Sequence, residues 1–303
     1  MKRLILVYNP RSSRFADVKA SVLDRVHDLK SFTIGKYEIA PTNLDDNIAK
    51  LSQILRDDDL LLSAGGDATG VICANAIIKS KKDVTLSVLP FGNFNDLART
   101  LGTKTFDDIF SRNKLISKQL YPLEIIIDGK LFRYATCYVT IGMTAAAVKL
   151  YDSPKMRAKL KTNFGRKVSS YTNLTSWYFK NRHRQVFLPE FKLNSQPMSP
   201  KISDYAAVNG RSMARVMKGG EDFLDPTHFR SETDHLTSFY RLFKLMSRSI
   251  FSRIPGSTTT GDVIEFKNPA TFTLQAEGES KDCQNVKKIE IRKGTQCLKV
   301  ITN

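Results

Sequence analysis

The sequence predicts an α/β domain, with a parallel sheet covered by helices on both faces, followed by a β-rich, sandwich-like domain. In the first 120 residues, short and continuously apolar strands alternate with helical segments, a pattern typical of a parallel sheet buried on both sides. After about residue 120, strand-like runs dominate, and the change falls near Ser117–Leu120. We therefore place the first domain at residues 1–118 and the second at residues 119–293.

In the first domain, the expected strands are "RLILVYN", "KYEIA", "LLLSA" and "VTLSVLP". Helical spacing predicts helices over residues 17–30, 43–55 and 69–79. The carboxyl ends of parallel strands lie at one edge of a sheet, where ligands bind. The polar loops "NPRSSR", "GGDATG" and "PFGNFND" follow three of these strands, so we expect them to converge at that edge.

In the second domain, Asp128-Gly129 is a turn signal between two long strands. Further strands are expected in "RQVFLPEFKL", "SDYAAVNG", "DVIEFK", "ATFTLQAEG", "VKKIEIRK" and "QCLKVI". Helical stretches near residues 154–181 and 236–253 interrupt them. The pattern indicates a β-rich domain with helical insertions.

The composition excludes several classes of protein. At 303 residues, with 41% hydrophobic and 25% charged residues, the chain has the composition of a globular protein with a substantial core. Its four cysteines (Cys73, Cys137, Cys283 and Cys297) form no CxxC pair, which indicates a reducing compartment and no structural zinc. The N-terminal apolar run is too short for a signal peptide, and no segment approaches the roughly 18 apolar residues of a membrane-spanning helix.

The net charge of +17 is unevenly distributed. Residues 1–120 hold 18 Lys and Arg against 14 Asp and Glu, or +4, whereas residues 121–303 hold 29 against 16, or +13. Residues 236–253 have the pattern of a basic amphipathic helix, which suits an anionic membrane. A helix packed on the domain with a solvated basic face explains the pattern equally well. No nucleic-acid-binding motif accompanies the charge, so we expect no nucleic-acid partner.

The glycine loops have the form of an anion site. Glycine between a strand and a helix lets backbone N–H groups turn toward an anion, and the helix N-terminus adds partial positive charge. Gly65 and Gly66 have this placement, with Asp67 beside them, and Asn95 and Asp96 repeat it one strand later. A helix N-cap, which needs no ligand, explains Asp96 equally well. Each loop alone is therefore weak support for a phosphate site.

Taken in order, these segments resemble the diacylglycerol kinase catalytic-domain family, which includes sphingoid-base and ceramide kinases and is distantly related to NAD kinases. "YNPRSSR", "GGDAT" and "LPFGNFNDLARTLG" resemble its first three motifs. "YAAVNGRSMARVMKGGEDFLDP" and "LQAEGES" are similar to later ones, so the resemblance covers nearly the whole chain. It implies a site in the cleft between the two domains, with residues 294–303 returning to the first domain as a strand.

The resemblance also implies ATP and Mg²⁺ as cofactors and a lipid hydroxyl as phosphoryl acceptor. The candidate catalytic residues are then Asp67, Glu277 and Glu279, with Glu277 in the place of the family's catalytic aspartate. Glu277 and Glu279 alternate along a strand, so only one is expected to enter the site directly. The candidate nucleotide-binding residues are Asn9, Pro10, Arg11, Ser12, Ser13, Gly65, Gly66, Ala68, Thr69, Gly92, Asn93 and Asn95; the candidate substrate-binding residues are Asp96 and Arg99; the candidate metal ligands are Asp67, Glu232 and Asp234.

Four positions depart from the family pattern. Ser13 and Ala68 replace glycines, Asn93 replaces threonine, and Phe94 fills a position that is usually small. If residue 68 needs a left-handed backbone, alanine costs about 1–2 kcal/mol there. The family's structural metal loop is reduced to "RSETDHLTS", in which His235 stands where glycine is usual.

Three functions are compatible with the sequence. The leading hypothesis is an ATP-dependent kinase of diacylglycerol or a related lipid, cytoplasmic and peripherally associated with the anionic inner membrane, with a homodimer left open. The second is a lipid- or membrane-binding member of the same fold that has lost catalysis, as Ala68 and Phe94 suggest. The third is a kinase of a soluble substrate such as NAD, which shares the Gly-Gly-Asp loop. The sequence does not identify the lipid.

Overall fold

The structure is a computed structural model of the chain. It describes residues 2–12, 14–92, 94–110, 116–142, 144–146, 172, 188–199, 202–213, 217–234, 256–277 and 279–302. The helices expected near residues 154–181 and 236–253 lie outside these residues except for Thr172, and so do the predicted positions Ser13, Asn93 and His235. No helix in the described ranges is long and apolar enough to cross a membrane.

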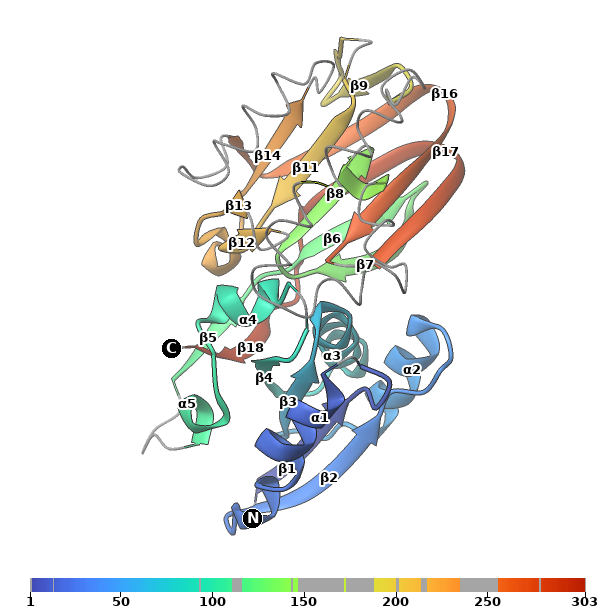
Figure 1. The fold of residues 1–303 in the computed structure, drawn as a ribbon. Helices are drawn as coiled ribbons and strands as arrows, with labels where there is room; N and C mark the ends of the chain where they lie inside the picture. Colours follow the sequence, from blue (N-terminus) through green and yellow to red (C-terminus); the bar gives the residue numbers. More distant parts are fainter. Residues whose placement is uncertain are drawn as a thin grey trace.

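The first domain is built on a sheet with the strand order β2-β1-β3-β4-β18-β5 (Figure 1). Neighbouring strands run parallel, except that β5 is antiparallel to β18. The strands are β1 (Lys2–Tyr8), β2 (Phe32–Glu38), β3 (Leu60–Gly65), β4 (Thr85–Pro90), β5 (Ser117–Leu120) and β18 (Leu298–Ile301). The helices are α1 (Phe15–Val18), α2 (Leu44–Ile54), α3 (Asp67–Ser80), α4 (Asp96–Leu101) and α5 (Phe106–Phe110).

Helices cover both faces of this sheet because successive side chains of a strand point to opposite sides. Ile5 of β1 lies in one buried cluster with Leu51 of α2 and Ile72 of α3. Its neighbour Leu4 lies in a second cluster with Val18 of α1. The predicted α/β domain, with a sheet buried on both faces, is confirmed.

The helix expected over residues 17–30 forms three short segments instead. The four-residue α1 continues into a π-helix at Lys19–Leu23, and a 3₁₀ turn follows at Val26–Asp28. Val18, Val22 and Val26 are buried at intervals of four residues. A strict four-residue repeat drifts around an α-helix of 3.6 residues per turn, and the wider π turn reduces that drift.

Within the described residues, the second domain contains an antiparallel sheet with the order β15-β14-β11-β8-β16-β17-β6-β7, to which the β9–β10 hairpin is joined through β16. Its strands are β6 (Leu123–Ile127), β7 (Lys130–Ala135), β8 (Tyr138–Gly142), β9 (Phe191–Leu193), β10 (Gln196–Pro197), β11 (Asp204–Val208), β14 (Phe229–Asp234), β15 (Ser257–Thr259), β16 (Gly261–Ala276) and β17 (Glu279–Lys293). A separate ribbon of β12 (Ser212–Met213) and β13 (Met217–Lys218) precedes a 3₁₀ turn at Asp222–Leu224.

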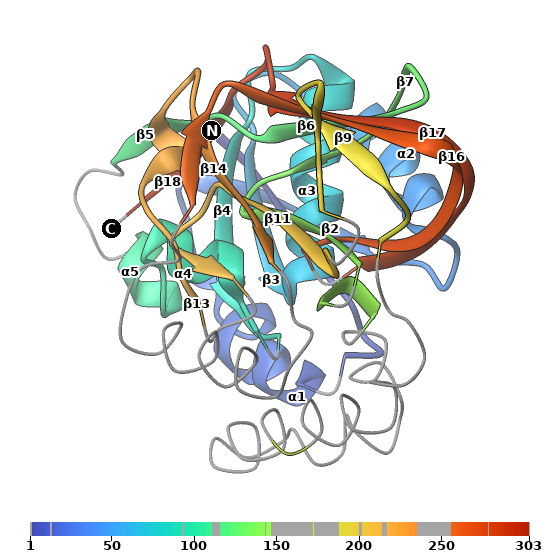
Figure 2. The ribbon, with the colours of Figure 1, turned by 90° about the horizontal axis from the view of Figure 1, so that it is seen from above.

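A bend in β16 gives the second domain its sandwich-like form. The pairing of β16 with β17 shifts register between Glu265 and Phe272, and such bulges bend a strand. Before the bend β16 pairs with β9, and after it β16 pairs with β8. Figure 2 shows β16 and β17 curving together around one side of the domain. The residues on both sides of the bend enclose one core, so the predicted β-rich, sandwich-like domain is confirmed in this curved form.

In the described residues, the chain passes between the domains at two adjacent places. β5 ends at Leu120 and β6 begins at Leu123, while β17 ends at Lys293 and β18 begins at Leu298. The N–H of Gly294 donates to the carbonyl of Pro122 at 2.7 Å, so the two crossings lie side by side. β18 then pairs with β4 and β5, which places the last strand of the chain in the first sheet.

Candidate active site between the two domains

Two glycine loops touch at the carboxyl edge of the first sheet. Gly66 follows β3 and Gly92 follows β4. A Cβ atom on Gly92 would lie 2.3 Å from the Cα of Gly66 and 2.9 Å from Oδ1 of Asn95. The loops therefore meet backbone against backbone, an approach that only glycine allows at position 92. α3 begins directly after Gly66, so the positive end of its dipole lies at this contact.

The carboxylate of Asp67 links the two loops. Its Oδ2 accepts a hydrogen bond from the N–H of Asn95 at 2.9 Å, and its Oδ1 accepts one from the N–H of Asp96 at 2.6 Å. Loss of surrounding water, and then the charge of Asp96, raise the pKa of Asp67 to about 7. A carboxyl group that titrates near neutral pH can exchange a proton during general acid–base catalysis.

Asn95 holds the second glycine loop in shape. It adopts a left-handed backbone with φ of 58°, which asparagine tolerates better than most residues. Its Oδ1 accepts from the N–H of Gly92 at 2.6 Å, and its Nδ2 donates to the carbonyl of Gly92 at 2.8 Å. The predicted nucleotide contact Asn95 thus uses its amide to brace the loop and its backbone N–H to position Asp67.

Ala68 lies in the first turn of α3 and is exposed. It is not among the described residues with positive φ, so the left-handed geometry that alanine would resist is absent at this position. Thr69 is buried behind it, and its N–H donates to the carbonyl of Gly66 at 3.0 Å. A Cβ atom on Gly65 would lie 2.3 Å from Oγ1 of Thr69, which explains a glycine at the end of β3.

The first loop is held by its own side chains. Oδ1 of Asn9 accepts from the N–H of Arg11 at 3.0 Å, and the N–H of Ser12 donates to the carbonyl of Asn9 at 3.0 Å. Pro10 lies between them, and Arg11 is exposed. The loop is therefore a compact turn that presents a cation at its surface.

Arg14 joins this first loop to the end of β4. Its Nη1 donates to the carbonyl of Pro90 at 3.1 Å, and its guanidinium lies 5.7 Å from the ring centre of Phe91. Arg14 is the last residue of the segment "YNPRSSR", but the sequence analysis did not select it as a site residue, because an arginine in a basic chain carries no signal of its own.

The two predicted substrate contacts have different surroundings. Asp96 is fully buried at the start of α4, and its Oδ1 accepts from Oγ of Ser212 in the second domain at 2.6 Å. Arg99 is exposed, and its Nε donates to the carbonyl of Phe94 at 3.0 Å. Asp96 thus supports the contact between the domains, while Arg99 is accessible from solvent. Ser212 lies within the motif-like segment "YAAVNGRSMARVMKGGEDFLDP", but the sequence analysis did not select it, and only this contact identifies its role.

Glu277 provides the opposite wall of the site. It follows β16 with a left-handed φ of 45° and is 1% exposed. Oγ1 of Thr136 donates to its Oε2 at 2.6 Å, and the N–H of Cys137 donates to its Oε1. Burial raises the pKa of Glu277 to about 8, and the charge of Asp67 adds to that rise. Carboxylates from the two domains therefore form one electrostatically coupled site, and strained backbones of this kind are common at active sites.

Glu279 has a different role from Glu277. It pairs with the guanidinium of Arg133, which also donates to Asp45 of α2 at 2.6 Å. The guanidinium of Arg133 is buried, whereas the side chains of Asp45 and Glu279 are 76% and 31% exposed, so this bridge between the domains lies at the protein surface. The expectation that Glu277 and Glu279 alternate along one strand is wrong, because β16 ends at Ala276, Glu277 lies in the turn that follows, and Glu279 begins β17. Glu277 shares an electrostatic environment with Asp67, whereas Glu279 helps to join the domains.

A reciprocal amide contact also joins the domains. Nδ2 of Asn75 in α3 donates to the carbonyl of Tyr134 at 2.9 Å, and Oδ1 of Asn75 accepts from the N–H of Tyr134 at 3.0 Å. Because the contact satisfies both backbone groups of one residue in β7, it fixes β7 against α3.

The remaining metal candidates lie in the second domain. Glu232 and Asp234 of β14 pair with Ala206 and Asp204 of β11. Asp204 is buried, which raises its pKa to about 7, and it accepts from Oγ1 of Thr144 at 2.5 Å. In the part of the chain that the structure describes, no three His, Cys, Asp or Glu side chains gather as metal ligands. Metal binding by Glu232 and Asp234 stays a prediction.

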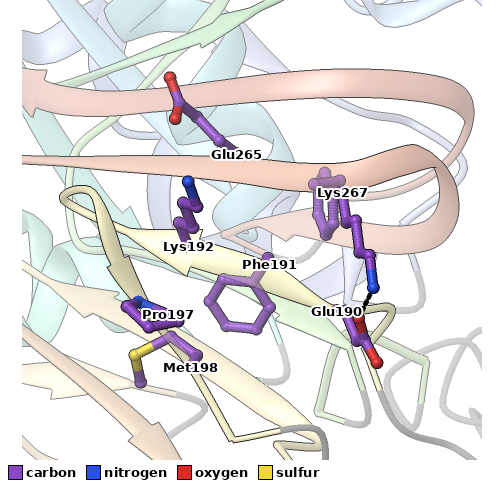
Figure 3. A pocket seen from close by; sticks show the side chains of 8 residues that line it. Glu190, Phe191, Lys192, Pro197, Met198, Glu265 and Lys267 are labelled. Carbon is purple, nitrogen blue, oxygen red and sulfur yellow. Dashed lines mark hydrogen bonds and ion pairs between the residues drawn. The ribbon is translucent and has the colours of Figure 1, made fainter.

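Two pockets lie outside this arrangement and contain none of the predicted site residues. One of about 350 Å³ lies beside the β9–β10 hairpin, with Phe191, Met198 and Pro197 in its wall and the ion pair of Lys267 with Glu190, 2.8 Å, at its edge (Figure 3). Figure 1 shows β9 at the end of the second domain that is remote from α3. The other, of about 530 Å³, lies beside α1 and is lined by residues that include Tyr8 and Phe15.

Comparison with known proteins agrees with the resemblance found in the sequence. Residues 3–126 match the model of the family described as the diacylglycerol kinase catalytic domain. The diacylglycerol kinase of Bacillus subtilis (strain 168) is 31% identical over 171 residues, which span 54% of this chain and 52% of that protein. The chain thus matches about half the length of this relative.

Among solved structures, a diacylglycerol kinase from Bacillus anthracis strain Sterne has a TM-score of 0.65, with 15% sequence identity over 100% of this chain and 97% of that chain. At this level of identity the likeness shows the fold, which spans both domains. The family match covers residues 3–126, whereas the shared fold covers the whole chain.

Proposed function

Because the chain belongs, through residues 3–126, to the diacylglycerol kinase catalytic-domain family, we propose that it is an ATP-dependent kinase that phosphorylates the hydroxyl of diacylglycerol or a related lipid. The observation that supports this most directly is the coupled pair of carboxylates, Asp67 and Glu277, held by different domains with pKa values raised to about 7 and 8. Acid–base residues with such pKa values suit a reaction that removes a proton near neutral pH.

The residues of the first domain fit the phosphates of ATP with a bound Mg²⁺. The Gly66–Gly92 contact leaves no side chain between the two loops, and the N-terminus of α3 favours negative charge there. Asp67 would hold the cation, because Mg²⁺ is commonly bound by one or two carboxylates together with substrate phosphates. Mg²⁺-ATP would supply the phosphoryl group, with part of its charge neutralised by the metal.

Glu277 is the proposed general base. Its carboxylate would take the proton from the lipid hydroxyl as the hydroxyl oxygen forms its bond to the γ-phosphorus of ATP, while the bond from that phosphorus to the β,γ-bridging oxygen breaks and ADP leaves. The hydrogen bonds from Thr136 and Cys137 keep that carboxylate in one orientation. Burial keeps competing water away from it.

A lipid acceptor requires contact with a membrane surface. The charge of +13 on residues 121–303 favours an anionic surface, which supports peripheral association with the inner membrane from the cytoplasm. An anionic lipid surface is therefore the proposed partner, a nucleic acid is not, and dimerisation is left open.

The structure bears on the alternative of a catalytically inactive binding protein. Two residues, Ala68 and Phe94, suggested this alternative. Ala68 lies in regular helix without a positive φ, so the backbone strain that alanine would cause in a left-handed conformation is absent. The alternative of a kinase for a soluble substrate such as NAD predicts no preference for lipid vesicles.

The proposal is tested with vesicles that contain diacylglycerol in an anionic phospholipid background. We expect phosphate transfer from ATP that depends on Mg²⁺, and a fall of at least about 10²-fold in Asp67→Asn, which keeps the shape but removes the charge. Calorimetry of Mg²⁺-ATP binding shows whether Asp67→Asn lowers the activity by weakening nucleotide binding. Absence of transfer to any hydroxyl lipid in a broad panel would contradict the proposal.

A further inference from the structure

Lys293 is a buried cation that the proposed mechanism does not use. It is the last residue of β17, beside the crossing between the domains, and it is 7% exposed. Its Nζ donates to the carbonyl of Asp222 at 2.5 Å, to the carbonyl of Tyr121 at 3.4 Å and to Oδ1 of Asn209. All three acceptors are neutral oxygens, so the ammonium makes no direct ion pair through these contacts.

Asn209 connects this cation to the peptide between Thr136 and Cys137. While Oδ1 of Asn209 accepts from Lys293, its Nδ2 donates to the carbonyl of Thr136 at 2.8 Å. The N–H groups of Asn209 and Gly210 both donate to the carbonyl of Cys137, at 2.7 Å and 2.8 Å. The backbone at residues 136–137 is thus fixed from the side on which Lys293 lies.

The same peptide unit holds Glu277 on its other side. The carbonyl of Thr136 and the N–H of Cys137 belong to one planar trans amide, so they point in opposite directions. The carbonyl accepts from Asn209, and the N–H donates to Oε1 of Glu277. Two amides, that of Asn209 and this peptide, therefore lie head to tail between the ammonium and the carboxylate. Hydrogen bonds arranged in such a chain polarise and strengthen one another.

We propose that Lys293 is a positioning residue for Glu277, acting through the side-chain amide of Asn209 and the Thr136–Cys137 peptide. Lys293 favours the ionised form of Glu277 and fixes the donors that orient it. This inference depends on the proposed function only for the catalytic meaning of Glu277; the connection itself is a property of the fold.

Other charges also act on the two ends of this connection. Asp67 of α3 raises the pKa of Glu277, and the adjoining titratable side chains are Cys137, Tyr138 at the start of β8, and Asp96, whose charge raises the pKa of both Cys137 and Tyr138. At the other end, burial lowers the pKa of Lys293 to about 8, while Asp222 and Asp225 act in the opposite direction. The test therefore has to change Lys293 and leave these groups in place.

The direct test is the titration of the Glu277 carboxyl by NMR in the full chain, labelled with ¹³C at glutamate carboxyl carbons. The signal of Glu277 is identified by its loss in Glu277→Gln. In Lys293→Met we expect the titration midpoint of Glu277 to rise by about 0.5–1 pH unit, less than the 1–3 units of a charge in direct contact. Lys287→Met, which removes an exposed cation from the same strand, is the matched control and should leave the midpoint in place.

A second variant tests the linking amide of Asn209 while the ammonium of Lys293 stays in place. Asn209→Ala keeps Lys293 but removes the linking amide, and we expect the midpoint to rise in the same direction. If the kinase is active, the acidic limb of the kcat/KM profile should move upward in pH with the NMR midpoint. An unchanged midpoint in both folded variants, or an equal change in Lys287→Met, overturns the proposal. A chain without kinase activity would refute the proposed function, while the NMR titration would still decide this inference.

Discussion

The two walls of the site hold a carboxylate in opposite ways. In the first domain, Asp67 stands at a helix N-terminus and accepts hydrogen bonds from backbone N–H groups that glycine and asparagine place there. In the second domain, Glu277 is buried at a strained position after a strand, and a hydroxyl and a backbone N–H of a neighbouring segment hold it. The hydrogen bonds of the first wall join residues 28 and 29 positions apart in the sequence, whereas those of the second join residues 140 and 141 positions apart.

This difference assigns different tasks to the two carboxylates. Asp67 is partly exposed, so it can contact a charged ligand directly. Glu277 is enclosed, and its burial opposes ionisation. The pKa values of both carboxyl groups are raised, so accessibility separates their roles: the partly exposed Asp67 suits cation binding, and the enclosed Glu277 suits proton transfer.

The largest effect is expected from Glu277→Gln. It removes the proposed base with little change in shape, so kcat should fall by about 10²–10⁴-fold. Glu279→Gln is the comparison, because Glu279 pairs with Arg133 and supports the domain contact. Its effect on kcat should be much smaller, with the loss appearing in thermal stability instead. Equal losses of kcat would remove the distinction between the two glutamates.

The same Glu277→Gln variant should be more stable than the parent at high pH. The pKa of Glu277 is about 8 in the folded protein, whereas its ordinary value is 4.5. Between these two pH values, the folded state therefore keeps a proton that the unfolded state has released. Stability from this group is therefore present below about pH 4.5 and is lost as the pH rises toward 8. Glutamine does not titrate. Melting curves from pH 5 to 9 should show a stability advantage of the variant that grows with pH.

A smaller but still large effect is expected from Gly92→Ala. The added methyl would lie 2.3 Å from the Cα of Gly66, so one glycine loop must move away from the other. We expect a stability loss of about 1–3 kcal/mol and weaker nucleotide binding. Gly261→Ala is the matched control, because a Cβ atom there has only ordinary contacts at 3.6 Å. Denaturation and calorimetry of both variants measure the difference, and similar behaviour would mean that the two loops do not need close contact.

The contrast between the walls also explains what the sequence could predict. The parallel sheet, the loops "GGDATG" and "GNFND" and the position of Asp67 follow from local patterns, and the structure brings these loops together. The second wall depends on Thr136, Asn209 and Lys293, which are separated by up to 157 residues in sequence numbering and have no motif in common. A buried lysine at the end of an amphipathic strand looks, in sequence alone, like any exposed cation. Only the register of β17 and the two crossings between the domains reveals its contacts.

The smallest effect is expected from Ala68→Gly, which restores the residue usual in the family motif. Because Ala68 lies in the first turn of α3 and has no positive φ, glycine brings no conformational relief there. It adds backbone freedom to the unfolded chain and should destabilise the protein by about 0.5–1 kcal/mol. We expect ATP turnover not to rise, and thermal unfolding beside a turnover assay measures both effects. A severalfold gain in turnover would show that this helix end must open into left-handed geometry when nucleotide binds. The first wall would then be less preformed than the second.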